Sequence, residues 1–235
     1  IVPTEEFTDV SRAGGYGDFM TQTDEAVGRI LQALADNGFT DNTLVIFSAD
    51  NGADHYSYER IRKFGNRSSG PLLGVKRDLY EGGHRVPFIV KWPGQVKPGS
   101  VCDAITSQVD IFATIAAALE VDLPADCAHD GHNMLAVWRE NAPGPRRSIV
   151  HNTNEGAYAI RHENWVLIAA KSGAHSKVPA WFDEENGYAR NDQPGELYDL
   201  ASDLAQKHNL YAERPDKVKE LTDLLKQIRA KGQVR

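Results

Sequence analysis

Two oxygen ligands and one cation lie within a single stretch of this chain. Asp50 and Asn51 directly follow the apolar segment 44–49, and Lys76 lies later in the polar segment that comes next. A carboxylate and an amide carbonyl are hard donors that suit Ca²⁺ or Mg²⁺. A lysine ammonium is a compact positive charge for a sulfate or phosphate ester. Together these residues predict a metal-assisted site for an anionic substrate.

Each of these residues also has an ordinary structural explanation. Asp-Asn-Gly is common turn chemistry, and most lysines are surface charges. Taken one by one, these residues fit the structural explanation better. Their position keeps the functional explanation open, because ligands of open α/β sheets bind beyond the carboxyl ends of the strands, where Asp50 and Asn51 lie. Lys76 comes shortly before Glu81-Gly82-Gly83, whose glycines allow the backbone to approach a ligand closely.

Weaker candidates for lining a substrate cleft share this loop or precede a later hairpin: His55, Asn66, Arg67 and His151. Arg85 is expected to form a structural ion pair with Glu81, and His84 is expected to pack beside it. Loops as long as 52–85 inside compact domains are usually functional or disordered.

The elements that must position these residues predict an α/β fold. Residues 18–37 have helical apolar spacing, with Ile30 and Leu34 on the inner face and Gly38 as the stop. The runs 43–49 and 86–92 have the composition of strands, and an unbroken apolar run is typical of a parallel sheet covered on both faces. Residues 110–119 predict a short helix with Ile111, Phe112, Ile115 and Leu119 inward, and residues 120–147 read as mostly loop.

The pattern changes near residue 148. Residues 157–161 and 165–169 predict a hairpin, residues 196–200 predict another strand, and Pro215 opens a final helix at its first position. We therefore predict two parts: an α/β part with a mainly parallel sheet at 1–147, and a small antiparallel sheet with a helix at 148–235.

Composition limits the possible functions. The chain has 235 residues, enough for a full core, and a net charge of −7, which gives no electrostatic support to a nucleic-acid partner. No apolar run is long enough for a membrane span. Cys102 and Cys127 lack CxxC spacing, which argues against a cysteine zinc site; they are consistent either with one disulfide or with two thiols.

Residues 43–94 resemble the sulfatase family. The matching motifs are TLVIFSADNG at 43–52, Gly74-Val-Lys76, EGGHRVP at 81–87 and Trp92-Pro93-Gly94. Further matches in family order are Tyr16-Gly17, DEAVGRIL at 24–31, VDIFAT at 109–114, Asp130-Gly131, ELYDL at 196–200 and Asn209-Leu210. The resemblance therefore extends over nearly the whole chain.

This resemblance implies part of an alkaline phosphatase-like sandwich and hydrolysis of a sulfate monoester, carried by a sulfated small molecule or a sulfated carbohydrate. Sulfatases use a formylglycine nucleophile, made from a Cys or Ser in a C/S-x-P-x-R motif, and a divalent ion that is usually Ca²⁺; Mg²⁺ stays possible here. By position, Asp50 and Asn51 would be two metal ligands. Lys76 would contact the sulfate and stabilise the charge that develops on its oxygens.

The chain departs from the family at the nucleophile. Neither Cys102 nor Cys127 fits the motif, and Ser69-Gly70-Pro71 begins it but Leu73 stands where arginine is required. The paired aspartates and the leaving-group histidine of the family are missing too. We expect these groups upstream, in a missing N-terminal half of the same protein, and we expect the chain alone to be inactive. The chain begins Ile1-Val2-Pro3 without methionine, so an export signal for a periplasmic, secreted or lysosomal location would also lie upstream.

Two alternatives stay open. The first is a phosphonate or phosphate ester hydrolase of the same superfamily, which would share Asp50 and Asn51 and differ in its nucleophile. The second is a truncated, non-catalytic binding module. The exposed strand edge left by dividing a sheet argues against the second, because such edges promote aggregation.

Overall fold

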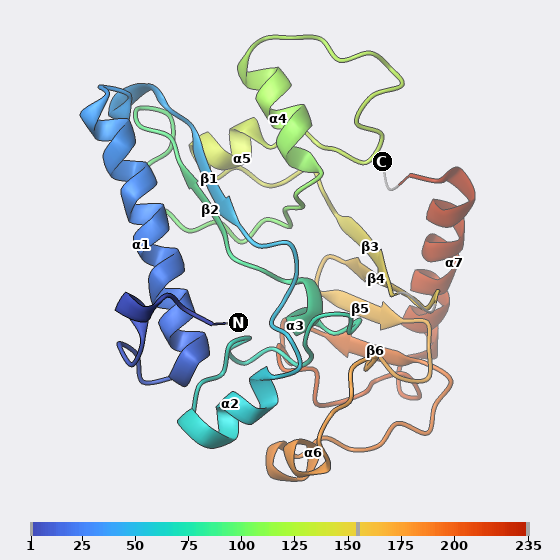
Figure 1. Cartoon of the computed structure of the whole chain (residues 1–235). Helices are drawn as coiled ribbons and strands as arrows, with labels where there is room; N and C mark the ends of the chain where they lie inside the picture. The colour runs from blue at the N-terminus through green and yellow to red at the C-terminus, as the bar shows by residue number, and fades with distance from the viewer. Residues whose placement is uncertain (1, 154–155, 234–235) are drawn as a thin grey trace.

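The computed structural model describes residues 2–153 and 156–233. Its elements, in chain order, are η1 (Glu5–Phe7), α1 (Gly14–Asp36), η2 (Thr40–Asn42), β1 (Val45–Ser48), α2 (Ser57–Phe64), α3 (Glu81–His84), β2 (Phe88–Lys91), α4 (Asp110–Ala118), α5 (Leu135–Glu140), β3 (Ser148–Asn152), β4 (Tyr158–His162), β5 (Trp165–Ile168), α6 (Ala180–Asn186), β6 (Glu196–Asp199) and α7 (Pro215–Lys231). The mixed α/β class that the sequence predicts is confirmed (Figure 1).

β1 and β2 form a two-stranded sheet, and here the predicted parallel pairing is wrong. The strands are antiparallel, with Val45 opposite Lys91 and Ser48 opposite Phe88. Residues 49–87 return the chain to the end of the pair from which it left, so β2 runs back along β1. One face of the pair packs on α5 through Leu44, Ile46, Phe88 and Val90. The other face exposes the cross-strand neighbours Phe47 and Ile89, so the predicted cover on both faces is also wrong within the described residues.

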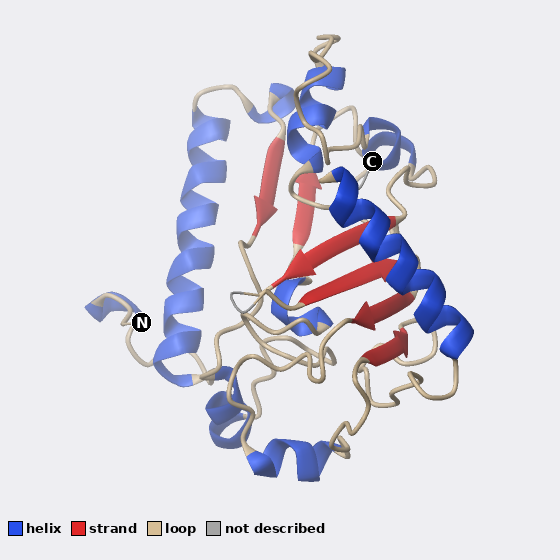
Figure 2. Cartoon of the chain, turned by 90° about the vertical axis from the view of Figure 1, so that its right-hand side faces the viewer, coloured by secondary structure: helices blue, strands red, loops and turns tan. Residues whose placement is uncertain are grey.

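The C-terminal strands form the predicted antiparallel sheet, in the order β3-β4-β5-β6. Its register places Val150, Ile160, Leu167 and Leu197 in one row. This row packs against Leu221, Leu225 and Ile228 of α7, which lies across that face of the sheet (Figure 2). The opposite face packs on residues of the long loop after β1, including Tyr58, Val75, Leu79 and Tyr80. The sheet is therefore the platform on which the loop containing Lys76 rests.

Two helices form as predicted, but their buried faces follow the prediction only in part in α1 and not in α4. Among the described side chains of α1, Asp18 alone is buried, and Ile30 is 62% exposed. In α4 the small residues Ala113, Thr114 and Ala116 are buried, whereas Phe112 and Leu119 are 59% and 68% exposed. The predicted inner face of α4 is therefore wrong within the described residues: Thr114 Oγ1 accepts the Met134 N–H at 3.0 Å, so the small face of α4 lies on segment 132–134. For α1 the prediction holds in part, because Leu34 is half-buried whereas Ile30 is exposed.

Other local differences concern short helices and the cysteines. α2, α3, α5 and α6 lie in segments that the sequence predicts as loops, and they are only four to eight residues long. Cys102 and Cys127 are free thiols. No helix in the described part of the chain has both the length and the apolar character that crossing a bilayer requires.

Candidate active site

The segment after β1 is fixed by close backbone packing. Gln108 Nε2 donates to the Ala49 carbonyl at 2.5 Å and holds the end of the strand. The Gly52 N–H donates to the Gly83 carbonyl at 3.0 Å. A Cβ at Gly52 would lie 1.8 Å from the Gly82 carbonyl oxygen, so only glycine fits there. Gly52, the residue after Asp50 and Asn51, therefore packs directly on α3, and α3 lies near the centre of the molecule (Figure 1).

Lys76 lies in a tight turn that packs on the same segment. Its N–H donates to the Ala53 carbonyl at 2.7 Å. Gly74 has φ +89°, and a Cβ there would meet Tyr80 Cβ at 2.8 Å. Arg77 has φ +83° although it is not glycine. Such a backbone conformation costs on the order of 1–3 kcal/mol and is frequent at functional sites. The structure therefore brings the Lys76 turn next to Asp50-Asn51-Gly52.

Glu81 is the centre of an ion-pair cluster behind these loops. It is 1% exposed and lies 3.3 Å from Arg85, 3.1 Å from Arg161 of β4 and 3.5 Å from His84. Burial raises the pKa of its carboxyl, but His84 and the two guanidinium groups outweigh burial and lower the pKa to about 2. The predicted Glu81–Arg85 pair is confirmed. The cluster ties α3 to the C-terminal sheet, because Arg161 belongs to β4.

His151 lies against the back of α3. Its ring contacts the His84 ring at a tilt of 36°, with 3.7 Å between ring centroids, and its Nε2 lies 3.1 Å from the Leu79 carbonyl oxygen. Burial and the neighbouring His84 lower the pKa of His151 to about 3, so the ring is neutral at physiological pH. The other ring nitrogen, Nδ1, is enclosed as well. This geometry fits a packing residue that supports the loop more closely than an open cleft residue.

The three remaining candidates lie in the loop between Asn51 and Lys76. His55 is about half exposed and pairs with Asp54 at 2.6 Å. Asn66 Oδ1 accepts the Ser68 hydroxyl at 3.0 Å. Arg67 Nη2 donates to Asn186 Oδ1 of α6 at 2.9 Å. The Arg67 contact joins two polar segments that are distant in sequence, 53–75 and 172–194.

Sequence reasoning missed two residues of this region. Gln108 fixes the end of β1, and its place in a polar stretch before α4 carries no recognisable signal. Asp78 is 4% exposed and accepts N–H groups from two loops. The signal for Asp78 was present in the sequence: a lone carboxylate between the apolar residues Val75 and Leu79.

Comparison with known proteins identifies the family. The family model described as "Sulfatase" matches residues 2–121, slightly more than half of the chain. The chain belongs to the sulfatase family. A second model, "N-sulphoglucosamine sulphohydrolase, C-terminal", matches residues 74–178 of this sulfatase chain.

Relatives match nearly the whole sulfatase chain. It is 35% identical to an N-acetylgalactosamine-6-O-sulfatase of Bacteroides thetaiotaomicron over 98% of its length and 45% of the relative. It is 31% identical to human arylsulfatase A over 95% of its length and 44% of that protein. A solved Bacteroides thetaiotaomicron structure, described in connection with the metabolism of multiple glycosaminoglycans, superposes with a TM-score of 0.81 at 34% identity, covering 97% of this chain and 47% of that one. The chain thus spans about half the length of the curated relatives it matches.

The oxygen donors of this sulfatase chain fit part of a divalent-cation site. Asn51 Nδ2 donates to the Gly52 carbonyl at 3.0 Å, which leaves the amide oxygen as the group available to a cation. Asp50 is exposed and supplies a carboxylate. Within the described residues, no group of three or more His, Cys, Asp or Glu side chains could hold a metal ion. Two hard oxygens fit Ca²⁺ or Mg²⁺, which take six or more ligands, only if further ligands come from elsewhere.

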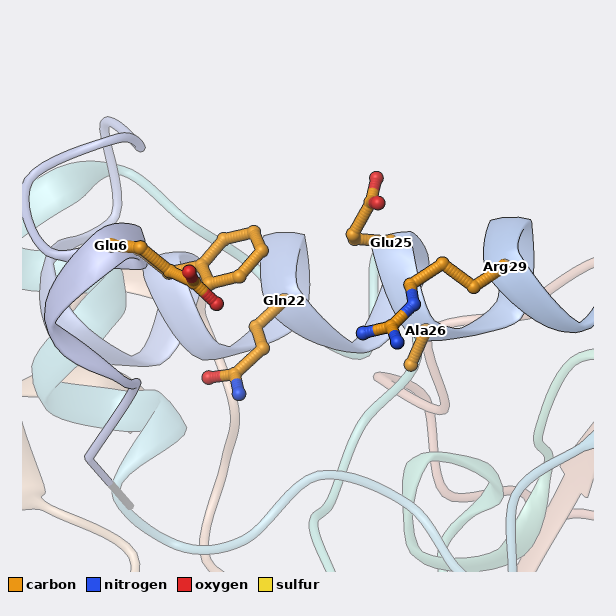
Figure 3. A pocket seen from close by; sticks show the side chains of 6 residues that line it. Glu6, Gln22, Glu25, Ala26 and Arg29 are labelled. Atoms are coloured by element: carbon orange, nitrogen blue, oxygen red, sulfur yellow. The ribbon is translucent and has the colours of Figure 1, made fainter.

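A surface hollow lies apart from this site. It is formed by η1 and α1, and Figure 3 shows side chains that line it from both elements. Its lining residues are Glu6, Phe7, Gln22, Glu25, Ala26 and Arg29. None of these six residues belongs to the candidate site, so the hollow has no part in the chemistry considered below.

Proposed function

We propose that this sulfatase chain supplies the metal-binding oxygens and the anion-binding lysine of a sulfate monoester hydrolase. One observation supports this proposal above the others: the hydrogen bond from the Lys76 N–H to the Ala53 carbonyl, at 2.7 Å. It joins the lysine turn to the segment that carries Asp50 and Asn51, so one cation and two oxygen ligands belong to one packed unit.

Each residue has a distinct role in the proposed reaction. Asp50 and Asn51 would hold a divalent ion, which acts as a Lewis acid and as a template for the reacting oxygens when bound. Lys76 is half-buried, and no carboxylate in the described part of the chain forms an ion pair with it. Its ammonium would stabilise the negative charge that builds up on the sulfate oxygens. The formylglycine nucleophile is proposed to lie in another part of the protein.

The proposed substrate is a sulfated carbohydrate, with a sulfated small molecule as the second choice. The relative with 35% identity is named for N-acetylgalactosamine 6-O-sulfate chemistry, and human arylsulfatase A is named for aryl sulfates. The segments 53–75 and 172–194, joined through Arg67 and Asn186, are where we expect the discrimination between them to arise.

We further propose that the chain needs a second half to act. Phe47, Ile89, Phe112 and Leu119 are exposed apolar side chains on a sheet face and a helix face, and such surfaces usually mark an interaction site. The chain corresponds to less than half of its curated relatives. The missing N-terminal half of the same protein is the proposed partner, and the isolated chain is expected to be inactive.

The test compares two proteins and two substrates. The full-length protein that contains this chain should hydrolyse 4-nitrophenyl sulfate faster than 4-nitrophenyl phosphate, and the 235-residue chain should hydrolyse neither. A preference for the phosphate ester would favour the phosphohydrolase alternative. No turnover by the full-length protein, combined with tight binding of a sulfated sugar, would favour a binding module. Turnover by the isolated chain would refute the need for a second half.

A further inference from the structure

A buried carboxylate, Asp78, holds the lysine turn together from inside. Its Oδ2 accepts the Val75 N–H at 2.9 Å, and its own N–H donates to the Val75 carbonyl at 2.9 Å. These two bonds close the turn on either side of Lys76. The turn contains Arg77 at φ +83°, and a residue held at positive φ persists only where the surrounding structure fixes it.

The same carboxylate reaches a segment about a hundred residues away. Asp78 Oδ1 accepts the N–H groups of His175 and Ser176, both at 2.8 Å. Two more bonds join the same pair of segments: the Leu79 N–H donates to the Gly173 carbonyl at 2.8 Å, and Ser176 Oγ donates to the Lys76 carbonyl at 2.8 Å. The lysine turn and segment 173–176 are therefore bound together along their length.

This junction is buried around Asp78 and uses the backbone. Asp78 is 4% exposed, and the flanking Val75 and Leu79 are 2% and 1% exposed. A buried carboxylate that accepts three N–H groups holds those groups strongly, because charge-assisted hydrogen bonds are the stronger class and unsatisfied buried donors are costly. Removing this one acceptor would leave the N–H groups of Val75, His175 and Ser176 without that partner at once.

We propose that Asp78 is a positioning residue: by binding the amides of Val75, His175 and Ser176, it fixes the Lys76 ammonium and makes segment 173–176 the wall beside it. This inference rests on the proposed function and extends it in two ways. Lysine placement depends on a residue that touches no substrate. Segment 173–176 also becomes the part of the 172–194 loop that meets the substrate next to its sulfate group.

A double-mutant cycle in the full-length protein tests the positioning role. Asp78→Asn keeps the size of the side chain but points an amide NH₂ at a backbone donor, so kcat for 4-nitrophenyl sulfate should fall by at least about tenfold with KM nearly unchanged. Because Asp78 acts through Lys76, the variant Asp78→Asn/Lys76→Ala should be no slower than Lys76→Ala alone, within about twofold. Multiplication of the two single effects would overturn the proposal. Asp18→Asn removes a buried carboxylate of α1 that accepts the N–H groups of Asp9 and Ser11, outside this junction. This control should leave kcat within about twofold.

Amide hydrogen exchange in the 235-residue chain tests the bridge separately. Asp78→Asn should speed exchange at Val75, His175 and Ser176 by at least about tenfold and leave the amides of α7 unchanged. Acceleration at Val75 alone would overturn the bridge. If Asp78→Asn does not fold, Ser176→Ala removes the bond to the Lys76 carbonyl and should give a smaller fall in kcat that also disappears in the Lys76→Ala background; an additive effect there would overturn the proposal. No turnover by the unmodified full-length protein would refute the proposed function, whereas the exchange result would still decide the bridge.

Discussion

The backbone N–H of Lys76 donates to the carbonyl oxygen of Ala53, and the N···O distance is 2.7 Å. These two residues are more than twenty positions apart, and α2 lies between them. The bond brings the turn that carries the cation onto the segment that carries the oxygen donors. Asp78 then extends the same unit to segment 173–176, so three separate stretches of chain form one support.

Glycine at position 52 is required by packing. Gly52→Ala would place a Cβ 1.8 Å from the Gly82 carbonyl oxygen, and the backbone must move to relieve the clash. We expect a loss of about 3 kcal/mol or more in the free energy of unfolding, since overpacking against rigid backbone is costly. The control is Gly28→Ala in α1, where a new Cβ meets nothing within 4 Å; it should stabilise by about 0.5–1 kcal/mol. Urea denaturation measures both, and equal effects would contradict the packing explanation.

Acid should destabilise the chain through His151. The pKa of His151 is lowered from 6.5 to about 3, chiefly by burial and then by His84, so the folded state prefers the neutral ring. Stability is complete above pH 6.5 and is lost as pH falls toward 3, by at most about 1.4 kcal/mol per pH unit from this group. His151→Gln should lose less stability than the wild type between about pH 6.5 and about pH 4.5. His129→Gln, at an exposed position, should follow the wild-type curve; identical curves for all three proteins would exclude His151 as the cause.

Glu196 should make the chain less stable as pH rises, which is opposite to the effect of His151. Burial raises the pKa of its carboxyl to about 7, and it accepts the Tyr80 hydroxyl at 3.1 Å and the Gly173 N–H at 3.3 Å. The folded state therefore prefers the protonated form: its contribution is complete below pH 4.5 and is lost as pH rises through about 7. Glu196→Gln should flatten the decline in stability between pH 5 and pH 8, approximately, when unfolding is followed by circular dichroism. A variant that declines as steeply as the wild type would refute this.

The buried ion pair between Asp110 and Arg146 should contribute far more to stability than the exposed ion pair of the next residue, Arg147. Asp110 is fully buried and accepts two bonds from the Arg146 guanidinium, at 3.0 and 2.5 Å. Arg146→Met leaves that carboxylate buried without its cation and should cost about 3–5 kcal/mol. Arg147 pairs with Glu163 at the surface, with 65% of its side chain exposed, and Arg147→Met should cost less than about 1 kcal/mol. Denaturant midpoints compare the two, and a small effect of Arg146→Met would mean that water replaces the guanidinium.

Metal binding by the isolated chain should be weak. Asp50 and Asn51 are two of the six or more oxygens that Ca²⁺ requires, so we expect a dissociation constant well above the micromolar range by calorimetry, and no heat for Asp50→Asn. The control is Asp41→Asn in the exposed η2 turn, which should match the wild type. A submicromolar isotherm for the 235-residue chain would show that the chain carries a complete site.

Local patterns were sufficient for several parts of the fold. Gly38 ends α1 with φ +77°, Pro215 begins α7, and the alternation in 157–169 gives the β4–β5 hairpin. The motifs around Asp50, Lys76 and Glu81 identified the family. These features depend on neighbours within a few positions, and short-range backbone preferences decide them.

The remaining features depended on contacts between distant segments. Three features depend on which distant segments the chain brings together, and apolar periodicity does not encode that. They are the antiparallel pairing of β1 with β2, the buried face of α4, and the bond from Lys76 to Ala53. The sequence alone determined which residue types could perform chemistry and which elements carry them. Only the tertiary structure decided that Asp78 reaches His175 and Ser176, because a buried carboxylate takes whichever amides the packing of two loops brings within hydrogen-bond distance.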